Sequence, residues 1–317
     1  MTMNFSGQVA IVTGAGGGMG RCYALELARR GAAVVVNDYG GGVLGEQNGS
    51  VAPAQAVVNE IVAMGGQGIA NGLPVGTAAN ARTIVQATLD AFGRIDILVN
   101  NAGTGIAGPF TAHDDEAIER HYATNLIGAH HLMRAAWPHM AENRYGRILN
   151  VSSNGALGVG GNAPYGAAKA GMLGLTLDTA IEGKPLGILV NAVMPTSYSR
   201  LIEQIPDAST VAWFRDNLPP EKVAAAMAWF LSRDCTETGR ILLTGGGRLS
   251  SLIFAETAEI FDPDISAERV AERIGEVWDE NILTPVHNQA EAGARYFRHL
   301  PWTAVDTPDF GPDVERG

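Results

Sequence analysis

Short apolar runs alternate with segments of helical periodicity along roughly the first 250 residues of the chain. The first run, residues 8–13, leads into a cluster of glycines, and the segment after it places Met19, Tyr23 and Leu27 on one helical face. Within the runs, apolar residues do not alternate with polar ones, which is typical of parallel strands buried on both faces. The sequence therefore predicts an α/β fold with a doubly wound parallel sheet and helices on both faces.

The expected elements follow one another in a regular order. We expect strands over residues 8–13, 33–38, 67–73, 95–101, 147–153, 187–195 and 240–246, and helices after the glycine cluster and over 52–64, 79–92, 115–141 and 163–182. The stretch 196–220 has little periodicity and contains Pro206, Pro219 and Pro220. It is expected to form an irregular lid or substrate loop.

A change of pattern near residue 250 divides the chain into residues 1–250 and an extension, 251–317. In the extension, Ser266 is placed to cap a helix whose apolar residues lie on one stripe. The residues of that stripe are Val270, Ile274, Val277 and Trp278. Because an apolar stripe needs a partner surface, we expect the extension to pack on the preceding domain or on a neighbouring subunit.

Charge, cysteine usage and histidine spacing limit the classes of function. The chain has 22 basic and 33 acidic side chains and a net charge of −11, which argues against binding nucleic acid through bulk charge. Cys22 and Cys235 form no CxxC motif, and no basic residue precedes Arg21, so we expect small buried cysteines and a cytoplasmic protein without a membrane span. The histidines lack metal-ligand spacing, so no metal site is expected. Those expected on helix surfaces or at interfaces are His121, His130, His131 and His139.

The glycine cluster after the first strand reads TGAGGGMG over residues 13–20. Its spacing does not fit GxGxxG, but it fits TGxxxGxG, in which residues without a Cβ let the backbone approach a pyrophosphate at a helix N-terminus. Asp38 ends the next strand, where a carboxylate can accept both ribose hydroxyls of an adenosine and repels the 2′-phosphate of NADP. The two features predict NAD as the cofactor. Their alternatives are an ordinary tight turn and a surface residue before Gly40.

Tyr165 and Lys169 form a second candidate pair, in the sequence YGAAK. Their i, i+4 spacing places the phenol and the ammonium on one helix face. A cation beside a phenol lowers the phenol pKa, so Tyr165 is a candidate general base near neutral pH. Taken alone, the pair could also be a solvated helix face. Because the glycine cluster, Asp38 and the NNAG motif at 100–103 accompany the pair, a chance occurrence of Tyr165 and Lys169 at this spacing is disfavoured.

The motifs resemble those of the short-chain dehydrogenase/reductase family over residues 6–250, with TGxxxGxG, NNAG, Asn125, NVSS at 150–153 and YxxxK in family order. The resemblance implies a Rossmann-type fold and an oxidoreductase acting on a CH–OH group, with a tetrad of Asn125, Ser153, Tyr165 and Lys169. It implies Asn101 near the adenosine and Gly103 close to the cofactor. The cofactor-binding residues expected on these grounds are Gly14, Gly18, Met19, Gly20, Asp38, Val75, Asn101, Ala102, Gly103, Tyr165, Lys169 and Pro195.

Further segments look like the (3R)-hydroxyacyl-CoA dehydrogenase units of peroxisomal multifunctional enzymes of type 2, which are also known as 17β-hydroxysteroid dehydrogenases. These segments are VVVNDYGG at 34–41, RAAWPHM at 134–140, YGRILNVSS at 145–153 and AIEG at 180–183. The resemblance implies a lipid-type substrate, a 3-hydroxyacyl-CoA first and a hydroxysteroid or steroid-CoA second, and a homodimer or homotetramer. Alternatives are a non-catalytic NAD-binding sensor or subunit and an NADPH-dependent ketoreductase, which Asp38 disfavours.

Two positions depart from the family pattern, and a third, the catalytic serine, has two candidates. Pro74 stands before Val75 where the family often has Asp, so position 74 lacks the family's adenine-binding side chain, and Pro195 is followed by Thr196 where the family usually has Gly. Spacing to the tyrosine favours Ser152 as the catalytic serine. Only one of two adjacent strand residues can face the cofactor. The resemblance implies that this is Ser153, because the NVSS run ends the strand as it does in relatives, in which the second serine is the catalytic one. We expect Ser153 to be the substrate-positioning residue.

Overall fold

The computed structural model describes residues 3–42 and 49–296, and the chain divides between Leu252 and Ile253 into two compact units. Within these residues, no helix is long and apolar enough to cross a membrane. Both cysteines are buried, as expected.

The first unit is built on an eight-stranded sheet with the order β3-β2-β1-β4-β5-β6-β7-β8. The strands are β1 Val9–Thr13, β2 Ala33–Asn37, β3 Gln67–Asn71, β4 Ile97–Asn100, β5 Gly146–Val151, β6 Ile188–Pro195, β7 Ile241–Gly245 and β8 Arg248–Leu252. Strands β1 to β7 are parallel, and β8 runs antiparallel to β7. The order reverses direction between β1 and β4, which confirms the doubly wound parallel sheet.

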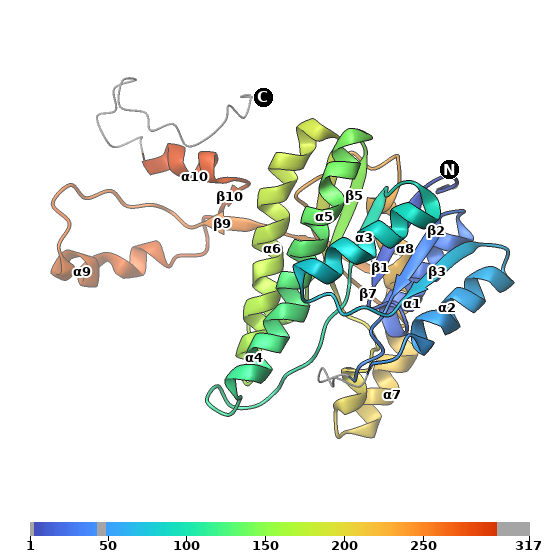
Figure 1. Ribbon diagram of the computed structural model, residues 1–317. Helices are drawn as coiled ribbons and strands as arrows, with labels where there is room; N and C mark the ends of the chain where they lie inside the picture. The colour runs from blue at the N-terminus through green and yellow to red at the C-terminus, as the bar shows by residue number, and fades with distance from the viewer. Residues whose placement is uncertain (1–2, 43–48, 297–317) are drawn as a thin grey trace. The chain divides into compact units, whose positions relative to one another are not determined.

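Helices cover both faces of this sheet (Figure 1). They are α1 Gly18–Arg29, α2 Ala52–Ala63, α3 Ala78–Phe92, α4 Asp115–Tyr122, α5 Gly128–Glu142, α6 Ala163–Gly183, α7 Ala208–Asn217 and α8 Pro220–Leu231. In β1, Ala10 and Val12 belong to the core with α1, α2 and α8, whereas Ile11 belongs to the core with α3 and α5. Because successive side chains point to opposite faces, a strand between two helical layers must be apolar throughout.

The sequence prediction was wrong for the segment after β6. Instead of an irregular loop, the stretch 196–220 contains α7, whose N-terminus is capped by Asp207 through the amides of Ser209 and Thr210. The helix has only ten residues and no buried side chain, so its periodic signal is weak. Helix α8 and strand β8 were not anticipated either.

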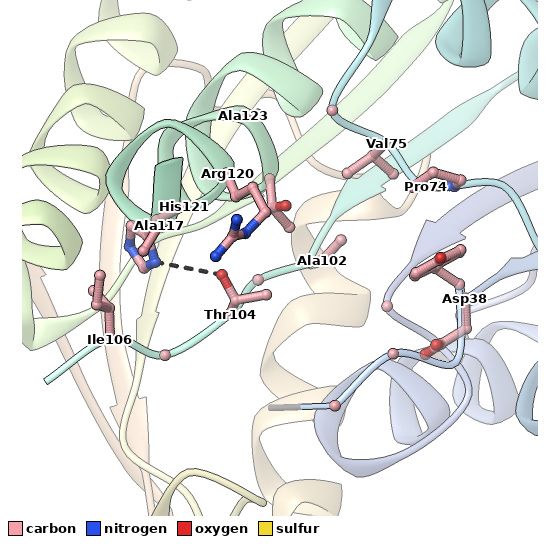
Figure 2. Close-up of a pocket in the computed structure, with 18 of the residues that line it drawn as sticks. Asp38, Pro74, Val75, Ala102, Thr104, Ile106, Ala117, Arg120, His121 and Ala123 are labelled. Carbon is pink, nitrogen blue, oxygen red and sulfur yellow. Dashed lines mark hydrogen bonds between the residues drawn. The ribbon is translucent and has the colours of Figure 1, made fainter. Parts of the chain in front are cut away.

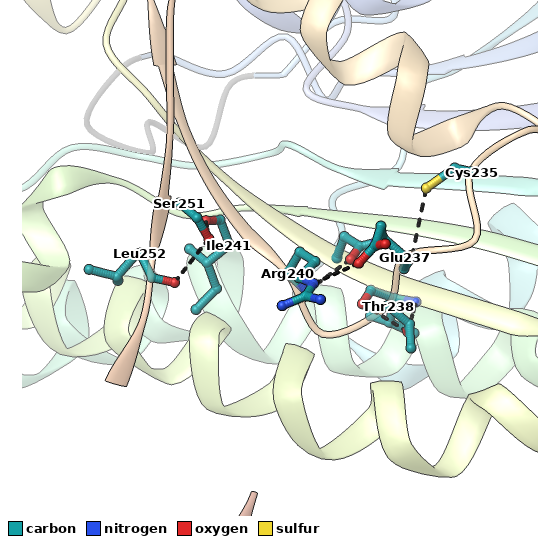
Figure 3. A network of polar contacts seen from close by, with 9 residues as sticks. Cys235, Glu237, Thr238, Arg240, Ile241, Ser251 and Leu252 are labelled. Carbon is teal, nitrogen blue, oxygen red and sulfur yellow. Dashed lines mark hydrogen bonds and ion pairs between the residues drawn. The ribbon is translucent and has the colours of Figure 1, made fainter. Parts of the chain in front are cut away.

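Polar contacts hold β7 between its neighbours (Figure 3). The hydroxyl of Ser251 on β8 donates to the carbonyl of Ile241 at 3.3 Å, and the amide of Arg240 donates to Asn191 Oδ1 on β6 at 2.9 Å. An ion pair joins Arg240 Nε to Glu237 Oε2 at 2.7 Å. The antiparallel pairing of β8 with β7 extends the parallel sheet by one strand at its edge.

The expected helix over 115–141 is continuous but not uniform. Helix α4 passes through a π-helical turn, η1 Ala123–Ile127, into α5. A π turn inserts one extra residue into the helix, which rotates the following side chains, and such turns are frequent at functional sites. Asn125 lies in this turn.

The second unit contains β9 Phe254–Glu256, α9 Ala267–Val277, β10 Thr284–Val286 and α10 Gln289–Tyr296, with β9 and β10 antiparallel. As expected, Ser266 caps α9 by accepting from the amide of Arg269 at 3.3 Å. The apolar stripe of α9 is only partly covered in the structure, since Ile274 and Val277 are half-buried whereas Val270 is exposed and Trp278 is 71% exposed. A partner surface for the stripe therefore stays a prediction.

Candidate active site

A cavity of about 610 Å³ opens where β1, β2 and β4 end (Figure 2). Its wall includes five of the expected cofactor residues, which are Gly14, Asp38, Val75, Ala102 and Gly103. Asp38 lies at one end of the cavity, and His121 and Ile106 lie at the other. The carboxyl ends of parallel strands at a reversal of strand order are the usual ligand crevice of such sheets.

The glycine turn after β1 is held from the side by the loop after β4. The Asn101 amide donates to the carbonyls of Thr13 and Gly14 at 2.9 and 3.1 Å, and the Thr13 hydroxyl accepts from the amides of Asn101 and Ala102, both at 3.0 Å. A Cβ on Gly20 would lie 2.2 Å from the Gly14 carbonyl oxygen, so only glycine fits there. Asn101, expected near the adenosine, is bound to the turn and is absent from the cavity wall. Gly18, Met19 and Gly20, which lie at the start of α1, are also absent from the cavity wall.

Asp38 is a buried carboxylate, 7% exposed, that joins the glycine turn to the loop after β2. Its Oδ2 accepts from the amide of Gly16, and its Oδ1 accepts from the amide of Gly40, both at 2.7 Å. A Cβ on Gly16 would lie 2.9 Å from Asp38 Oδ2, so the turn and the carboxylate are in close contact. This burial does not fit the alternative of an exposed turn residue.

The loop after β3 forms another part of the wall. Val75 is buried, and its side chain leaves no room for a Cβ on Gly128, which would lie 2.7 Å from Val75 Cγ2. The carbonyl of Pro74 accepts from Asn80 Nδ2 at 2.9 Å. Both Pro74 and Val75 line the cavity, so an adenine there would meet apolar atoms.

The two adjacent serines at the end of β5 point to different partners. Ser152 is buried, and its hydroxyl donates to the main-chain carbonyl of Lys169 at 2.7 Å. The Ser153 hydroxyl accepts from the amide of Gly155 at 3.1 Å. A Cβ on Gly155 would lie 3.5 Å from Ser153 Oγ and 2.8 Å from Tyr165 Cε1, so the serine hydroxyl and the tyrosine ring border the same glycine. The structure therefore brings Ser153, and not Ser152, to the tyrosine.

Tyr165 and Lys169 lie one turn apart on α6, with Lys169 Nζ 5.7 Å from the centre of the Tyr165 ring. Lys169 is 4% exposed and donates to the carbonyl of Val151 at 2.8 Å, and burial lowers its pKa to about 8. Burial raises the pKa of Tyr165, while the neighbouring Ser153 hydroxyl opposes this rise. The expectation of a lowered phenol pKa is thus wrong for this state of the protein, because desolvation outweighs the other influences.

Asn125, in the π turn, faces Lys169 across Gly103. Its amide nitrogen donates to the carbonyls of Thr104 and His121 at 3.2 and 3.1 Å. Among the described residues, its buried Oδ1 has no hydrogen-bond partner. A Cβ on Gly103 would lie 2.7 Å from this oxygen and 3.7 Å from Lys169 Nζ, so the absence of a side chain leaves space between the two groups.

One residue of this site lies elsewhere than the sequence predicts. His121 was expected on a helix surface or at an interface, but it is 2% exposed and lines the cavity beside Thr104. Its only sequence signal was the i, i+4 spacing to Asn125. Among the described residues, no group of His, Cys, Asp and Glu has the arrangement of a metal site. Tyr165, Lys169 and Pro195, the last residue of β6, are not in the cavity wall.

Comparison with known proteins places this arrangement in a family. Residues 8–201 match the family model of the short chain dehydrogenases. The chain is 37% identical over 278 residues to peroxisomal multifunctional enzyme A of Dictyostelium discoideum, covering 87% of this chain and 61% of that protein. It is 34% identical over 254 residues to a (2S)-[(R)-hydroxy(phenyl)methyl]succinyl-CoA dehydrogenase subunit of Thauera aromatica, covering 78% and 98%.

The fold agrees with these sequence matches. Full-length peroxisomal multifunctional enzyme type 2 of Drosophila melanogaster superposes with a TM-score of 0.75 at 27% identity, over 93% of this chain and 49% of that one. The chain thus spans less than two thirds of the length of these two peroxisomal proteins. Family members use a nicotinamide dinucleotide, phosphorylated or not, and the glycine turn with its cavity fits that group. The chain belongs to the short-chain dehydrogenase/reductase family.

Proposed function

We propose that this protein is an NAD-dependent dehydrogenase that interconverts the alcohol and the ketone of a 3-hydroxyacyl-CoA. The observation that carries the proposal is that Ser153 and Tyr165 both border Gly155, with the buried Lys169 Nζ 5.7 Å from the centre of the Tyr165 ring. A hydroxyl donor and a titratable phenol that face the same point can hold a substrate oxygen and exchange a proton with it.

The cavity fits a nicotinamide dinucleotide at its adenosine end. In the glycine turn, a Cβ on Gly17 or Gly18 would have no neighbouring atom within 4 Å, so the backbone there is open to a pyrophosphate. The Asp38 carboxylate stands in the cavity wall, where it favours ribose hydroxyls and disfavours a 2′-phosphate. The cofactor, when bound, supplies the hydride acceptor.

The chain's own residues provide the proton chemistry. Tyr165 takes the proton of the substrate hydroxyl, and Ser153 holds the oxygen during the transfer. Because the Tyr165 pKa is raised by burial, the phenolate needs a nearby positive charge. Lys169, with a pKa of about 8, is mainly charged at neutral pH and provides it. Asn125 holds a water molecule in the space beside Gly103 that links Lys169 to solvent.

Two apolar loops support a lipid-type substrate. Phe110 follows β4, and Leu157 and Val159 follow Ser153, and all three side chains are strongly exposed. The two loops are joined by a hydrogen bond from the amide of Gly108 to the carbonyl of Gly161 at 2.9 Å. Exposed apolar side chains close to a reactive site are typical of a binding surface for apolar ligands. The compound in the name of the Thauera relative is a CoA thioester that carries a hydroxyl group and an apolar phenyl group.

A substrate panel tests the proposal. (3R)-3-Hydroxyacyl-CoAs of several chain lengths and hydroxysteroids are each offered with NAD and with NADP, and the absorbance of the reduced nicotinamide is recorded. We expect turnover with the acyl-CoAs and NAD. If only hydroxysteroids are turned over, the substrate is a hydroxysteroid and not an acyl-CoA. If NAD binds but no alcohol is turned over, the protein is a non-catalytic sensor or subunit.

A further inference from the structure

The buried histidine on the last turn of α4 has no part in the reaction as proposed above. His121 Nδ1 lies 3.3 Å from Thr104 Oγ1, a contact that Figure 2 shows at one end of the cavity. The centre of its ring lies 5.9 Å from the centre of the Tyr165 ring, with 56° between the planes. The His121 ring therefore lies beside the ring of the catalytic tyrosine.

The ring and the main-chain carbonyl of His121, together with the Thr104 carbonyl, surround the amide nitrogen of Asn125. The amide nitrogen lies 3.1 Å from the His121 carbonyl, 3.2 Å from the Thr104 carbonyl, and 3.3 Å from each ring nitrogen of His121. A flipped amide would place its oxygen against the two carbonyl oxygens, which is repulsive. The amide thus has one favourable orientation, and in it Oδ1 points away from His121.

That orientation directs Oδ1 toward Lys169. Asn125 Oδ1 has no partner among the described residues, and it borders the space beside Gly103 that also borders Lys169 Nζ. A carbonyl-type oxygen near a buried ammonium favours its charged form, directly or through a water molecule. Asn125 in this orientation therefore supports the positive charge that Tyr165 needs.

The charge state of His121 is compatible with such a role. Burial lowers the pKa of His121 to about 4, and the charges of Lys169 on α6 and His113 on the preceding loop act in the same direction. The other titratable groups that face its ring are Tyr165 and Tyr122. The ring is uncharged near neutral pH, so it does not compete with the Lys169 cation.

We infer that His121 is a positioning residue for the dehydrogenase reaction, whose uncharged ring and main-chain carbonyl hold the Asn125 amide with Oδ1 toward Lys169 and support the Tyr165 ring. This inference rests on the proposed function, because it assigns Tyr165 the role of the base. It predicts that loss of the imidazole weakens the support of the Lys169 charge and makes the Tyr165 phenolate harder to form.

A titration of the protein without cofactor tests the inference independently of turnover. The protein is prepared with ¹³Cζ-labelled tyrosine, and the Tyr165 signal is identified by its loss in Tyr165→Phe. In His121→Phe, which keeps a ring but removes both nitrogens, we expect the Tyr165 pKa to rise above that of the wild type. Simple loosening of the packing would admit water and lower this pKa toward its ordinary value. An unchanged or lowered pKa overturns the inference.

Steady-state kinetics with NAD and 3-hydroxydecanoyl-CoA provide the second measurement. We expect His121→Phe to lower kcat by roughly ten- to a hundredfold, as for a misplaced catalytic group, with the KM for NAD changed by less than about twofold. The acidic limb of the kcat–pH profile should move to higher pH. His121→Gln, which keeps a polar partner for Thr104, should restore part of kcat, and His130→Phe, on the exposed side of α5, is the matched control.

One further variant keeps the outcome interpretable. If His121→Phe does not fold, Thr104→Val removes the hydroxyl that contacts both the imidazole and the Asn125 amide, and it should shift the Tyr165 pKa in the same direction. Unchanged kcat and pH limb in both variants overturn the inference. If Tyr165→Phe itself keeps turnover, the proposed function fails, whereas normal kinetics of His121→Phe beside an inactive Tyr165→Phe removes only the role of His121.

Discussion

The hydroxyl of Ser152 donates a 2.7 Å hydrogen bond to the main-chain carbonyl of Lys169 and so joins the end of β5 to α6. Ser153, the next residue, points the other way and borders Gly155, as does the ring of Tyr165. The first serine therefore fixes the position of the helix that carries Tyr165 and Lys169, and the second stands where a substrate oxygen would meet the tyrosine.

The two serines should separate in a kinetic assay. We expect Ser153→Ala to lower kcat by ~10²–10³-fold, the usual loss for one donor to a reacting oxygen. Ser152→Ala should lower stability by about 1 kcal/mol, for one lost hydrogen bond, and change kcat far less. Steady-state rates and thermal unfolding of both variants check this ranking, and the reverse order of rates would reject the role of Ser153.

Removing the phenol should abolish turnover and spare cofactor binding. Tyr165→Phe loses the group that exchanges the substrate proton, but it keeps the ring, so NAD affinity should stay nearly unchanged. Lys169→Ala should impair both rate and affinity, since the family resemblance places Lys169 at the nicotinamide ribose. Kinetics and fluorescence titration with NADH provide the measurements. A Tyr165→Phe variant with a substantial residual rate is the result that excludes this base.

The choice between NAD and NADP should depend on the charge of Asp38. Asp38→Asn keeps one oxygen acceptor for the amides of Gly16 and Gly40 and removes the charge that repels a 2′-phosphate. We expect the ratio of kcat/KM values for NAD over NADP to fall, with a loss in NAD binding of about 1–3 kcal/mol. The ratio is unaffected by a general loss of active protein. A wild type that prefers NADP contradicts the assignment.

Buried Lys169 should make stability rise with pH. Its pKa is lowered from 10.5 to about 8 in the folded state, so between these values the unfolded chain binds more protons, and the free energy of unfolding increases with pH. Below pH 8 the cost of burying the charge is present in full. Relative to Lys169→Met, the wild type should gain up to ~3 kcal/mol across this window.

Urea unfolding of both proteins between pH 7.5 and 10 measures this difference. The substitution also leaves the Val151 carbonyl without its lysine partner, but that loss does not vary with pH. A difference between the two proteins that is constant over the window would show that Lys169 titrates normally.

The exposed side chains of the α9 stripe should be buried against another surface in the assembled protein. We expect deletion of residues 262–317 to lower the melting temperature or change the assembly size, because the extension is predicted to pack on the preceding domain or on a second subunit. Trp278→Ser, at a side chain 71% exposed in the structure, should act in the same direction. Sedimentation and thermal melts that match the wild type would remove the packing role.

The sequence alone determined the architecture, because the signals for it are local. Apolar runs buried on both faces and helical periodicity predicted the doubly wound sheet, and the i, i+4 spacing placed Tyr165 and Lys169 on one helix face. The same reasoning missed α7, where a short exposed helix leaves almost no periodic pattern.

Only the tertiary structure decided how the local features meet. Asn101 binds the glycine turn because β4 pairs with β1, and Ser152 contacts Lys169 because α6 packs beside β5. His121 is buried, although the sequence placed it on a surface, since the loop after β4 and helix α6 cover it. The raised pKa of Tyr165 has the same origin. Desolvation depends on atoms that are distant in the chain, and no local pattern encodes it.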